Sequence, residues 1–165
     1  MVEVKIEAVR VSLMTTTQVI ILKDVNEDRF LPIFIAKPEG DSITVHLRDD
    51  VPGRPMSHDL ALQIVQLLDA QLVRIQIVEL RDQHYFAEIV IESNGQEWVL
   101  DSRASDAIAL AVRAQCPMYV SEDIMVEVGV APNDAEDESS AVSDDQFGVF
   151  GDFLDSLNLD LDDDK

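Results

Sequence analysis

Several residue types and motifs that mark common protein classes are missing from this 165-residue sequence. The single cysteine, Cys116, excludes an internal disulfide and a zinc site built from several cysteines. The sequence contains no run of 18 uncharged apolar residues, so we expect no membrane-spanning helix. The N-terminal stretch lacks the apolar core of a signal peptide, and we therefore expect a cytoplasmic location.

Basic residues are also scarce, with 12 Lys and Arg against 33 Asp and Glu, which gives a formal net charge of −21. Residues 1–131 hold 21 acids and 11 bases (net −10), and residues 132–165 hold 12 acids and 1 base (net −11). The domain itself is therefore acidic and repels phosphate backbones at long range. Chemistry on nucleic acid would need a local basic patch, a metal ion or screening by salt.

The hydrophobic pattern predicts three strands and a helix, an inserted helix, and then three strands and a helix again. The predicted strands of both halves are alternating or β-branched runs at 2–13, 18–23, 30–36, 72–80, 85–92 and 97–100. The predicted helices run from 38 to about 48, from 57 or 58 onward, and over 102–114, and a short strand follows at 118–120. Pro32 predicts an edge strand or a bulge, and Asn94-Gly95 predicts a tight hairpin turn.

The two halves resemble each other. KPEGDSITVHLR (37–48) aligns without gaps with SRASDAIALAVR (102–113), and the alignment pairs Asp41 with Asp106. This similarity predicts an internal repeat. We expect an α+β fold of two βββα-like halves, with helices packed on a mostly antiparallel sheet and one helix inserted between the halves. Exposed sheet edges would favour association into a dimer or a larger oligomer.

The composition changes after residue 131, where we place the end of the domain. Residues 132–146 are acidic and poor in apolar side chains, which predicts a disordered linker. Residues 147–165 form an acidic tail with large apolar residues at three- and four-residue steps, a pattern that is typical of an amphipathic helix. These residues are Phe147, Phe150, Phe153, Leu154 and Leu157.

Two polar clusters lie at predicted helix starts, while Gly-rich phosphate loops, nucleophile elbows and paired-His zinc motifs are absent. If the clusters form a functional site, they supply four catalytic groups, His58, Asp59, Asp101 and Asp106. They also supply three phosphate-binding groups, Arg54, Arg103 and Ser105. Glu39 could join Asp101 and Asp106 as carboxylate ligands of Mg²⁺ or Mn²⁺. As structural groups, Ser57 or Asp59 would cap one helix, Ser102 or Ser105 would cap the other, and Asp–Arg pairs would lock the fold.

Four segments, which together extend over roughly residues 3 to 130, resemble the bacterial bifunctional nuclease domain family. They are LPIFIAKPEGDSI (31–43), RPMSHDL (54–60), DSRASDAIALAVR (101–113) and CPMYVSEDI (116–124). The resemblance implies an α+β fold, self-association, and nuclease activity on RNA and DNA.

Individual residues of these segments match the positions of the family pattern. Glu39 matches the acid after the third strand. The family's two charged motifs are matched by Arg54, Pro55, His58 and Asp59, and by Asp101, Arg103, Ser105 and Asp106. The chain departs from the pattern at four positions, Ala36, Gly40, Ser57 and Ala104, where the family commonly has Gly, Ala, Thr and Pro.

Three functional hypotheses follow. The first is a divalent-metal-assisted nuclease of low sequence specificity that cleaves RNA or DNA, and it predicts that Glu39, His58, Asp101 and Asp106 converge in a groove. The second is a non-catalytic oligomeric module for regulation or interaction, in which these side chains bind each other or backbone amides. The third is a domain that binds small anions through Arg54 and Arg103.

Overall fold

In the computed structural model, residues 1–11, 17–48 and 53–131 are described, so the predictions for 132–146 and 147–165 lie outside the described residues. The strands are β1 (Val2–Val11), β2 (Thr17–Asp24), β3 (Phe30–Ala36), β4 (Gln71–Arg81), β5 (His84–Ser93), β6 (Gln96–Arg103) and β7 (Met118–Val120). The helices are α1 (Lys37–Leu47), α2 (Ser57–Leu67), α3 (Ala104–Ala114) and α4 (Glu122–Val128). Within the described part, no helix is long and apolar enough to cross a membrane.

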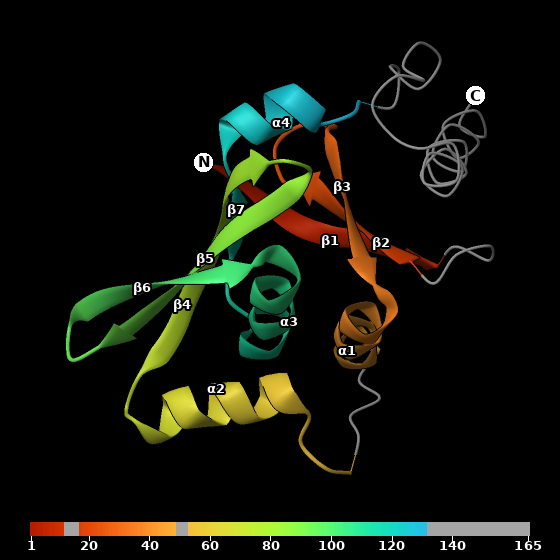
Figure 1. Cartoon of the computed structure of the whole chain (residues 1–165). Coiled ribbons are helices and arrows are strands. Elements are labelled where there is room, and N and C mark those ends of the chain that lie inside the picture. Colours follow the sequence, from red (N-terminus) through yellow and green to blue (C-terminus); the bar gives the residue numbers. More distant parts are fainter. Residues whose placement is uncertain (12–16, 49–52, 132–165) are drawn as a thin grey trace, which may run out of the picture.

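The seven strands form one sheet in the order β3-β2-β1-β7-β4-β5-β6 (Figure 1). Each predicted half is an antiparallel meander that runs directly into a helix, β1-β2-β3-α1 and β4-β5-β6-α3. The short strand β7 joins the halves, because it pairs antiparallel with β1 and parallel with β4. This arrangement confirms the predicted α+β class, with its mostly antiparallel sheet and the helix α2 inserted between the halves.

Local sequence signals explain the turns and one sheet edge. Asn94 and Gly95 have φ of 53° and 77°, as the predicted tight turn between β5 and β6 requires. Asp82 and Gln83 also have positive φ at the turn between β4 and β5. Pro32 lies on β3, an outer strand of the sheet, where the missing N–H of a proline is tolerated.

Two predictions at the ends of elements were wrong or incomplete. Strand β6 continues through Ser102 and Arg103, which pair with Ala87 and Phe86 of β5, so α3 begins at Ala104. Neither Ser102 nor Ser105 caps this helix, because backbone pairing extends the strand up to its first turn. Helix α4 was not predicted from the sequence; its seven residues are anchored by Ile124 and Met125 in the core.

The core lies between the sheet and the helices α1 and α3. Fully buried side chains from both halves meet there, including Ile20 of β2, Ile75 of β4, Ile43 of α1 and Ile108 of α3. The two isoleucines on the helices are the pair that the repeat alignment placed at equivalent positions. The internal repeat thus corresponds to two helices that bury equivalent faces in one core.

Close packing between α1 and β2 generates a test of this arrangement. A Cβ added at Gly40 would overlap the amide oxygen of Gln18, a buried residue whose Nε2 donates to Asp41 at 2.8 Å. We predict that Gly40→Ala lowers the free energy of unfolding by about 1 kcal/mol, because Gln18 must move and lose that hydrogen bond. Urea denaturation measures the change.

Gly53→Ala is the matched control, because no described atom lies within 4 Å of the added Cβ. We expect that variant to be at least as stable as the wild type. Equal stability of the two alanine variants would contradict the packing described for α1.

Candidate functional site

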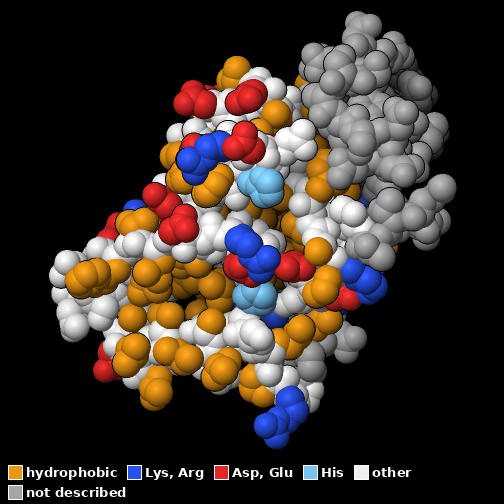
Figure 2. Space-filling view, in the orientation of Figure 1, with side chains coloured by type: hydrophobic (Ala, Val, Ile, Leu, Met, Phe, Trp, Pro, Cys, Tyr) orange, Lys and Arg blue, Asp and Glu red, His pale blue; other side chains and the backbone are white. Residues whose placement is uncertain are grey.

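The three helices α1, α2 and α3 meet in a network of polar side chains on one side of the sheet. Figure 2 shows basic, acidic and histidine side chains gathered near the centre of this face. The network has two layers. The helix lock is the buried layer, formed by Ser42, His46, Asp59 and Arg113. The surface cluster lies above it, formed by Glu39, His58, Arg103 and Asp106.

A buried arginine on α3 is the centre of the helix lock. The Arg113 side chain is 2% exposed, and its Nε donates to Asp59 Oδ1 at 2.6 Å. Its Nη1 donates to the Ala109 carbonyl oxygen at 2.8 Å, and its Nη2 donates to Ser42 Oγ at 3.0 Å. Asp59 belongs to α2 and Ser42 to α1, so one guanidinium fixes the three helices relative to each other.

Asp59 lies beneath the surface with both carboxylate oxygens occupied. Oδ2 accepts the backbone N–H of Met56, the residue before α2, at 2.6 Å, which is the capping role that the structural interpretation predicted. Oδ1 lies 2.6 Å from Arg113 Nε and 3.1 Å from His46 Nε2. Burial raises the pKa of Asp59, but the Met56 N–H and the Arg113 guanidinium outweigh it and bring the pKa below its ordinary value of 3.8. Asp59 is therefore an anion that positions α2.

His58 bridges α1 and α3 through both ring nitrogens. Nδ1 lies 3.1 Å from Ser42 Oγ, and Nε2 lies 3.0 Å from Asp106 Oδ1. An ionised carboxylate can only accept, so the Asp106 contact calls for a proton on Nε2. The Ser42 hydroxyl can accept from a charged ring or donate to a neutral one. Both protonation states of His58 therefore keep both hydrogen bonds, and the ring stays in place when its charge changes.

Arg103 is the most exposed member of the surface cluster. Its Nε and Nη2 donate to the two carboxylate oxygens of Asp106 at 2.7 and 3.0 Å, and its Nη1 donates to Glu39 Oε1 at 3.2 Å. The Arg103 side chain is 66% exposed, against 29% for Asp106 and 20% for Glu39. The Arg103 guanidinium is the largest influence on Asp106 and holds the pKa of that carboxyl below its usual range, although burial opposes it. Three of the five guanidinium N–H groups are used, so two remain for a ligand.

Three of the predicted site residues do not join the network. Arg54 is exposed in the loop before α2, Asp101 is exposed on β6, and Ser105 is half-buried in the first turn of α3. None of these side chains makes a hydrogen bond or ion pair with another residue of the described ranges. Their proposed roles in catalysis, phosphate binding and metal binding stay predictions.

The carboxylates predicted to bind a metal do not form one group. In the described part of the chain, no three His, Cys, Asp or Glu side chains come together in a way that could hold a metal ion. Both oxygens of Asp106 are bound to Arg103, and one of them is also bound to His58. Glu39 differs, because its Oε2 is buried without a hydrogen-bond partner among the described residues. Glu39 therefore has one carboxylate oxygen that could bind a cation. Asp106 could bind a cation only after one of its oxygens gives up a hydrogen bond to Arg103 or His58.

The sequence interpretation missed the part of the helix lock that α1 and α3 contribute. Ser42 and His46 are four residues apart, a spacing that places both on one face of α1. Arg113 is the one charge in the apolar run of α3 after Asp106. A charged side chain at the end of an otherwise apolar, core-facing helix was the available signal for a buried ion pair.

The family model of the bifunctional nuclease domain matches residues 20–133, which is more than half of the chain. The chain belongs to the bifunctional nuclease domain family. Uncharacterised proteins from two strains of Mycobacterium tuberculosis are 32% identical over 160 residues, 96% of each chain. Bifunctional nuclease 1 of Oryza sativa subsp. indica is 25% identical over 123 residues, 73% of this chain and 37% of the rice protein.

The region matched by the bifunctional nuclease domain contains both layers of the network. The first and last members of the two layers, Glu39 and Arg113, lie inside residues 20–133. The mycobacterial match extends further, because a match of 160 residues in a chain of 165 must include most of residues 132–165. The acidic tail is thus part of that similarity, although it lies beyond the bifunctional nuclease domain itself.

The lowered pKa of Asp59 predicts how the stability of the protein depends on pH. Because the folded-state pKa lies below the unfolded value, the Asp59 carboxylate stabilises the fold above about pH 4, and this contribution is lost as the pH falls through the lowered pKa. We predict that Asp59→Asn unfolds more easily than the wild type by about 2 kcal/mol at pH 7. Urea denaturation at a series of pH values should show that this difference in the free energy of unfolding shrinks steadily below pH 4.

Asp69→Asn is the control for the loss of one exposed carboxylate, because no hydrogen bond to the Asp69 side chain is present among the described residues. We expect that variant to follow the wild type at every pH. A wild-type advantage over Asp59→Asn that is the same at pH 3 and pH 7 would show that the Asp59 charge does not stabilise the fold.

Proposed function

We propose that the surface cluster hydrolyses the phosphodiester bonds of nucleic acids. The observation that carries the proposal is the pair of side chains at its centre: an exposed arginine with free donors, Arg103, and a histidine held at both ring nitrogens, His58. An arginine that can bind phosphate beside a histidine that can move a proton supplies two of the functions that this reaction requires. The rice relative, which is named bifunctional nuclease 1, supports the proposal.

Arg103 would bind the phosphate group that is cleaved. Its two unused N–H groups can donate to two phosphate oxygens, while Glu39 and Asp106 hold the guanidinium in place. Phosphate contacts of this kind carry no sequence information. Cleavage of RNA or DNA with low sequence specificity is therefore what a site built on Arg103 should produce.

His58 would supply a proton to the leaving oxygen. A water oxygen would attack phosphorus and form the new P–O bond, while the bond from phosphorus to the ester oxygen breaks. The attacking water would lose one proton to the solvent, from which His58 is protonated again after the reaction. The charged His58 ring then gives its Nε2 proton to that ester oxygen and keeps its Nδ1–H on Ser42 Oγ. Asp106 accepts the Nε2 proton before the reaction and would give up that hydrogen bond as the proton turns to the ester oxygen, while Ser42 keeps the ring in place through Nδ1. Asp59 does not touch the substrate in this scheme and acts as a positioning residue for α2.

A divalent cation, Mg²⁺ or Mn²⁺, is the further component that we propose. Mg²⁺ is commonly bound by one or two protein carboxylates together with substrate phosphates, and the free oxygen of Glu39 suits that arrangement. When bound, the ion would neutralise phosphate charge in the transition state. It would also offset the repulsion between nucleic acid and a domain whose net charge is −10.

Cleavage assays on single-stranded RNA and DNA test the proposal. We predict that His58→Gln lowers the cleavage rate at least about 100-fold, because glutamine can hydrogen bond but cannot transfer the proton. Arg103→Lys should chiefly raise KM, since lysine cannot bind two phosphate oxygens in the same fork. Both variants should keep the thermal unfolding midpoint within a few degrees, and added EDTA should abolish wild-type cleavage until Mg²⁺ or Mn²⁺ is restored.

His84→Gln is the matched control, because His84 is exposed in the β4–β5 hairpin and its Nδ1 contacts only the Asp82 carbonyl oxygen among the described groups. That variant should cleave like the wild type. Cleavage by folded His58→Gln at the wild-type rate would remove His58 from the mechanism. A highly purified wild-type protein that cleaves neither substrate with either metal would refute the proposed function.

A further inference from the structure

The first half of the sheet has a second apolar face, on the side away from the core that the helices share. Along β2, Ile20 and Leu22 belong to that core. Val19 and Ile21 therefore lie on the opposite, outer face, because the side chains of a strand alternate. A separate apolar cluster forms there, which we call the outer patch. Its members are Val19, Ile21 and Phe30, with Ala8, Phe34 and Val130 packed around them.

The outer patch is buried, although no described helix lies over it. Ile21 is 0% exposed, and Val19 and Phe30 are each 2% exposed. No residue of a described helix belongs to the patch, whereas all four helices contribute side chains to the core on the other face. The nearest apolar neighbours on the described strands, Ala8 and Phe34, are themselves only half-buried. A sheet face that is buried to this degree needs a further segment packed against it.

The acidic tail starts from the outer patch. Val130 donates to and accepts from the backbone of Phe30, at 2.8 Å in each direction, and both residues are members of the patch. Residues 132–165 follow one residue later. The other stretches outside the described ranges are short: 12–16 contains only two large apolar residues, and 49–52 connects α1 to α2 on the core side of the sheet. The tail is therefore the best-placed cover.

We propose that residues 147–157 of the tail cover the outer patch. The large apolar side chains of this segment recur at helical spacing and are Phe147, Phe150, Phe153, Leu154 and Leu157. Ten residue steps of a helix extend about 15 Å. The patch extends about 13 Å along β3, from Phe30 to Phe34. The apolar stripe of the tail thus matches the length of the surface that it would cover.

The intervening chain is long enough for this contact. Sixteen residue steps separate Ala131 from Phe147, and a flexible connection of that length spans roughly 22 Å on average. The three strands that carry the patch are only two strand spacings wide, or about 10 Å. The match to the mycobacterial proteins also includes most of residues 132–165, as expected for a segment that packs on the domain.

Charge at the rim of the patch favours an acidic cover. Lys5 and Lys23 are directly opposite each other on β1 and β2, and Arg10 is opposite Val19. Like charges at opposite positions repel each other unless acidic groups approach them. Asp28 lies 2.9 Å from Lys23 and supplies part of that charge. Residues 132–165, with a net charge of −11, would supply more.

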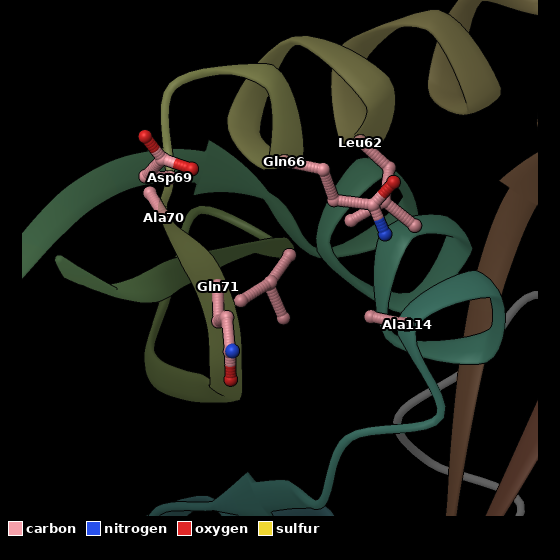
Figure 3. A pocket seen from close by; sticks show the side chains of 7 residues that line it. Leu62, Gln66, Asp69, Ala70, Gln71 and Ala114 are labelled. Carbon is pink, nitrogen blue, oxygen red and sulfur yellow. The ribbon is translucent and has the colours of Figure 1, made fainter.

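The outer side of α2 is the other apolar surface that the tail could cover. Leu67 and Leu68 are 82% and 69% exposed there. Beside them lies a hollow of about 480 Å³, lined by Leu62, Leu72 and Ala114 among others (Figure 3). A segment that docks on a surface removes its apolar side chains from water. The side chains of α2 are exposed and those of the outer patch are buried, so the outer patch is the place that is covered.

Hydrogen exchange of the full chain, followed by mass spectrometry, tests this inference. In the wild type, we expect the backbone amides of residues 147–157 to exchange at least about tenfold more slowly than those of a synthetic peptide with the same sequence. Phe34→Asp places a carboxylate in the patch and should bring this exchange to within about twofold of the peptide. Arg10→Glu, at an exposed position, should reduce the protection about threefold without disturbing the fold.

Leu67→Asp is the matched control, because it makes the same kind of change on the exposed side of α2. It should keep the wild-type protection of residues 147–157. Far-UV circular dichroism checks that each variant is folded, and Arg10→Glu carries the test if Phe34→Asp does not fold.

Three outcomes would overturn the inference. The first is a wild-type tail that exchanges as fast as the peptide. The second is protection that Leu67→Asp removes and Arg10→Glu keeps, which would assign the tail to α2. The third is protection that neither Phe34→Asp nor Arg10→Glu changes, which would place the tail elsewhere. No variant here alters the surface cluster, so these results are independent of the cleavage assays.

Discussion

The buried ion pair between Arg113 and Asp59 is the interaction on which the candidate site depends. Most helices are held by the apolar side chains that they bury, but α2 has no buried residue. Leu62 packs against the core only in part, and the start of α2 is fixed by Asp59, which binds the Met56 N–H on one side and the Arg113 guanidinium on the other. His58 is the neighbour of Asp59 in the chain, so the same pair also determines where the imidazole ring lies.

The fold brings the remaining members of the site together through its repeat. Strands β3 and β6 run directly into α1 and α3, and neither helix start is capped by a side chain. These two junctions supply Glu39 and Arg103, which bind each other across the halves of the molecule. The inserted helix α2 adds His58 between them. The site is thus a product of the duplicated junction and one element that lies outside the repeat.

Much of the fold could be predicted from local patterns. The alternating strands, the Asn94-Gly95 turn and the edge position of Pro32 each follow from residues close in sequence. The end of β6 could not be predicted in this way, because its last residues are held as strand by pairing with β5 rather than by their own propensity. Helix α4 is short and depends on two side chains that reach a distant core.

The site was predicted only in part, for a related reason. Side chains such as His58, Arg103 and Asp106 were recognised by their chemistry and by family resemblance, but a sequence does not show which of them meet in space. The two polar motifs also look alike in sequence. In the fold, Asp59 is buried and paired with Arg113, and Asp106 is shared by Arg103 and His58. The Asp101 side chain makes no hydrogen bond or ion pair with a described residue. Convergence of this kind depends on tertiary packing, which local periodicity does not encode.

A double-mutant cycle on the Asp59–Arg113 pair is the most direct measurement of the central claim. Urea denaturation at neutral pH would compare Asp59→Asn, Arg113→Met and the double variant with the wild type. If the pair holds α2 in place, Arg113→Met lowers the free energy of unfolding by about 3–5 kcal/mol. The double variant should be little less stable than Arg113→Met alone, which gives a coupling energy of about 2 kcal/mol between the two side chains. Losses that add to within about 0.5 kcal/mol would contradict the account, because the two side chains would then act independently.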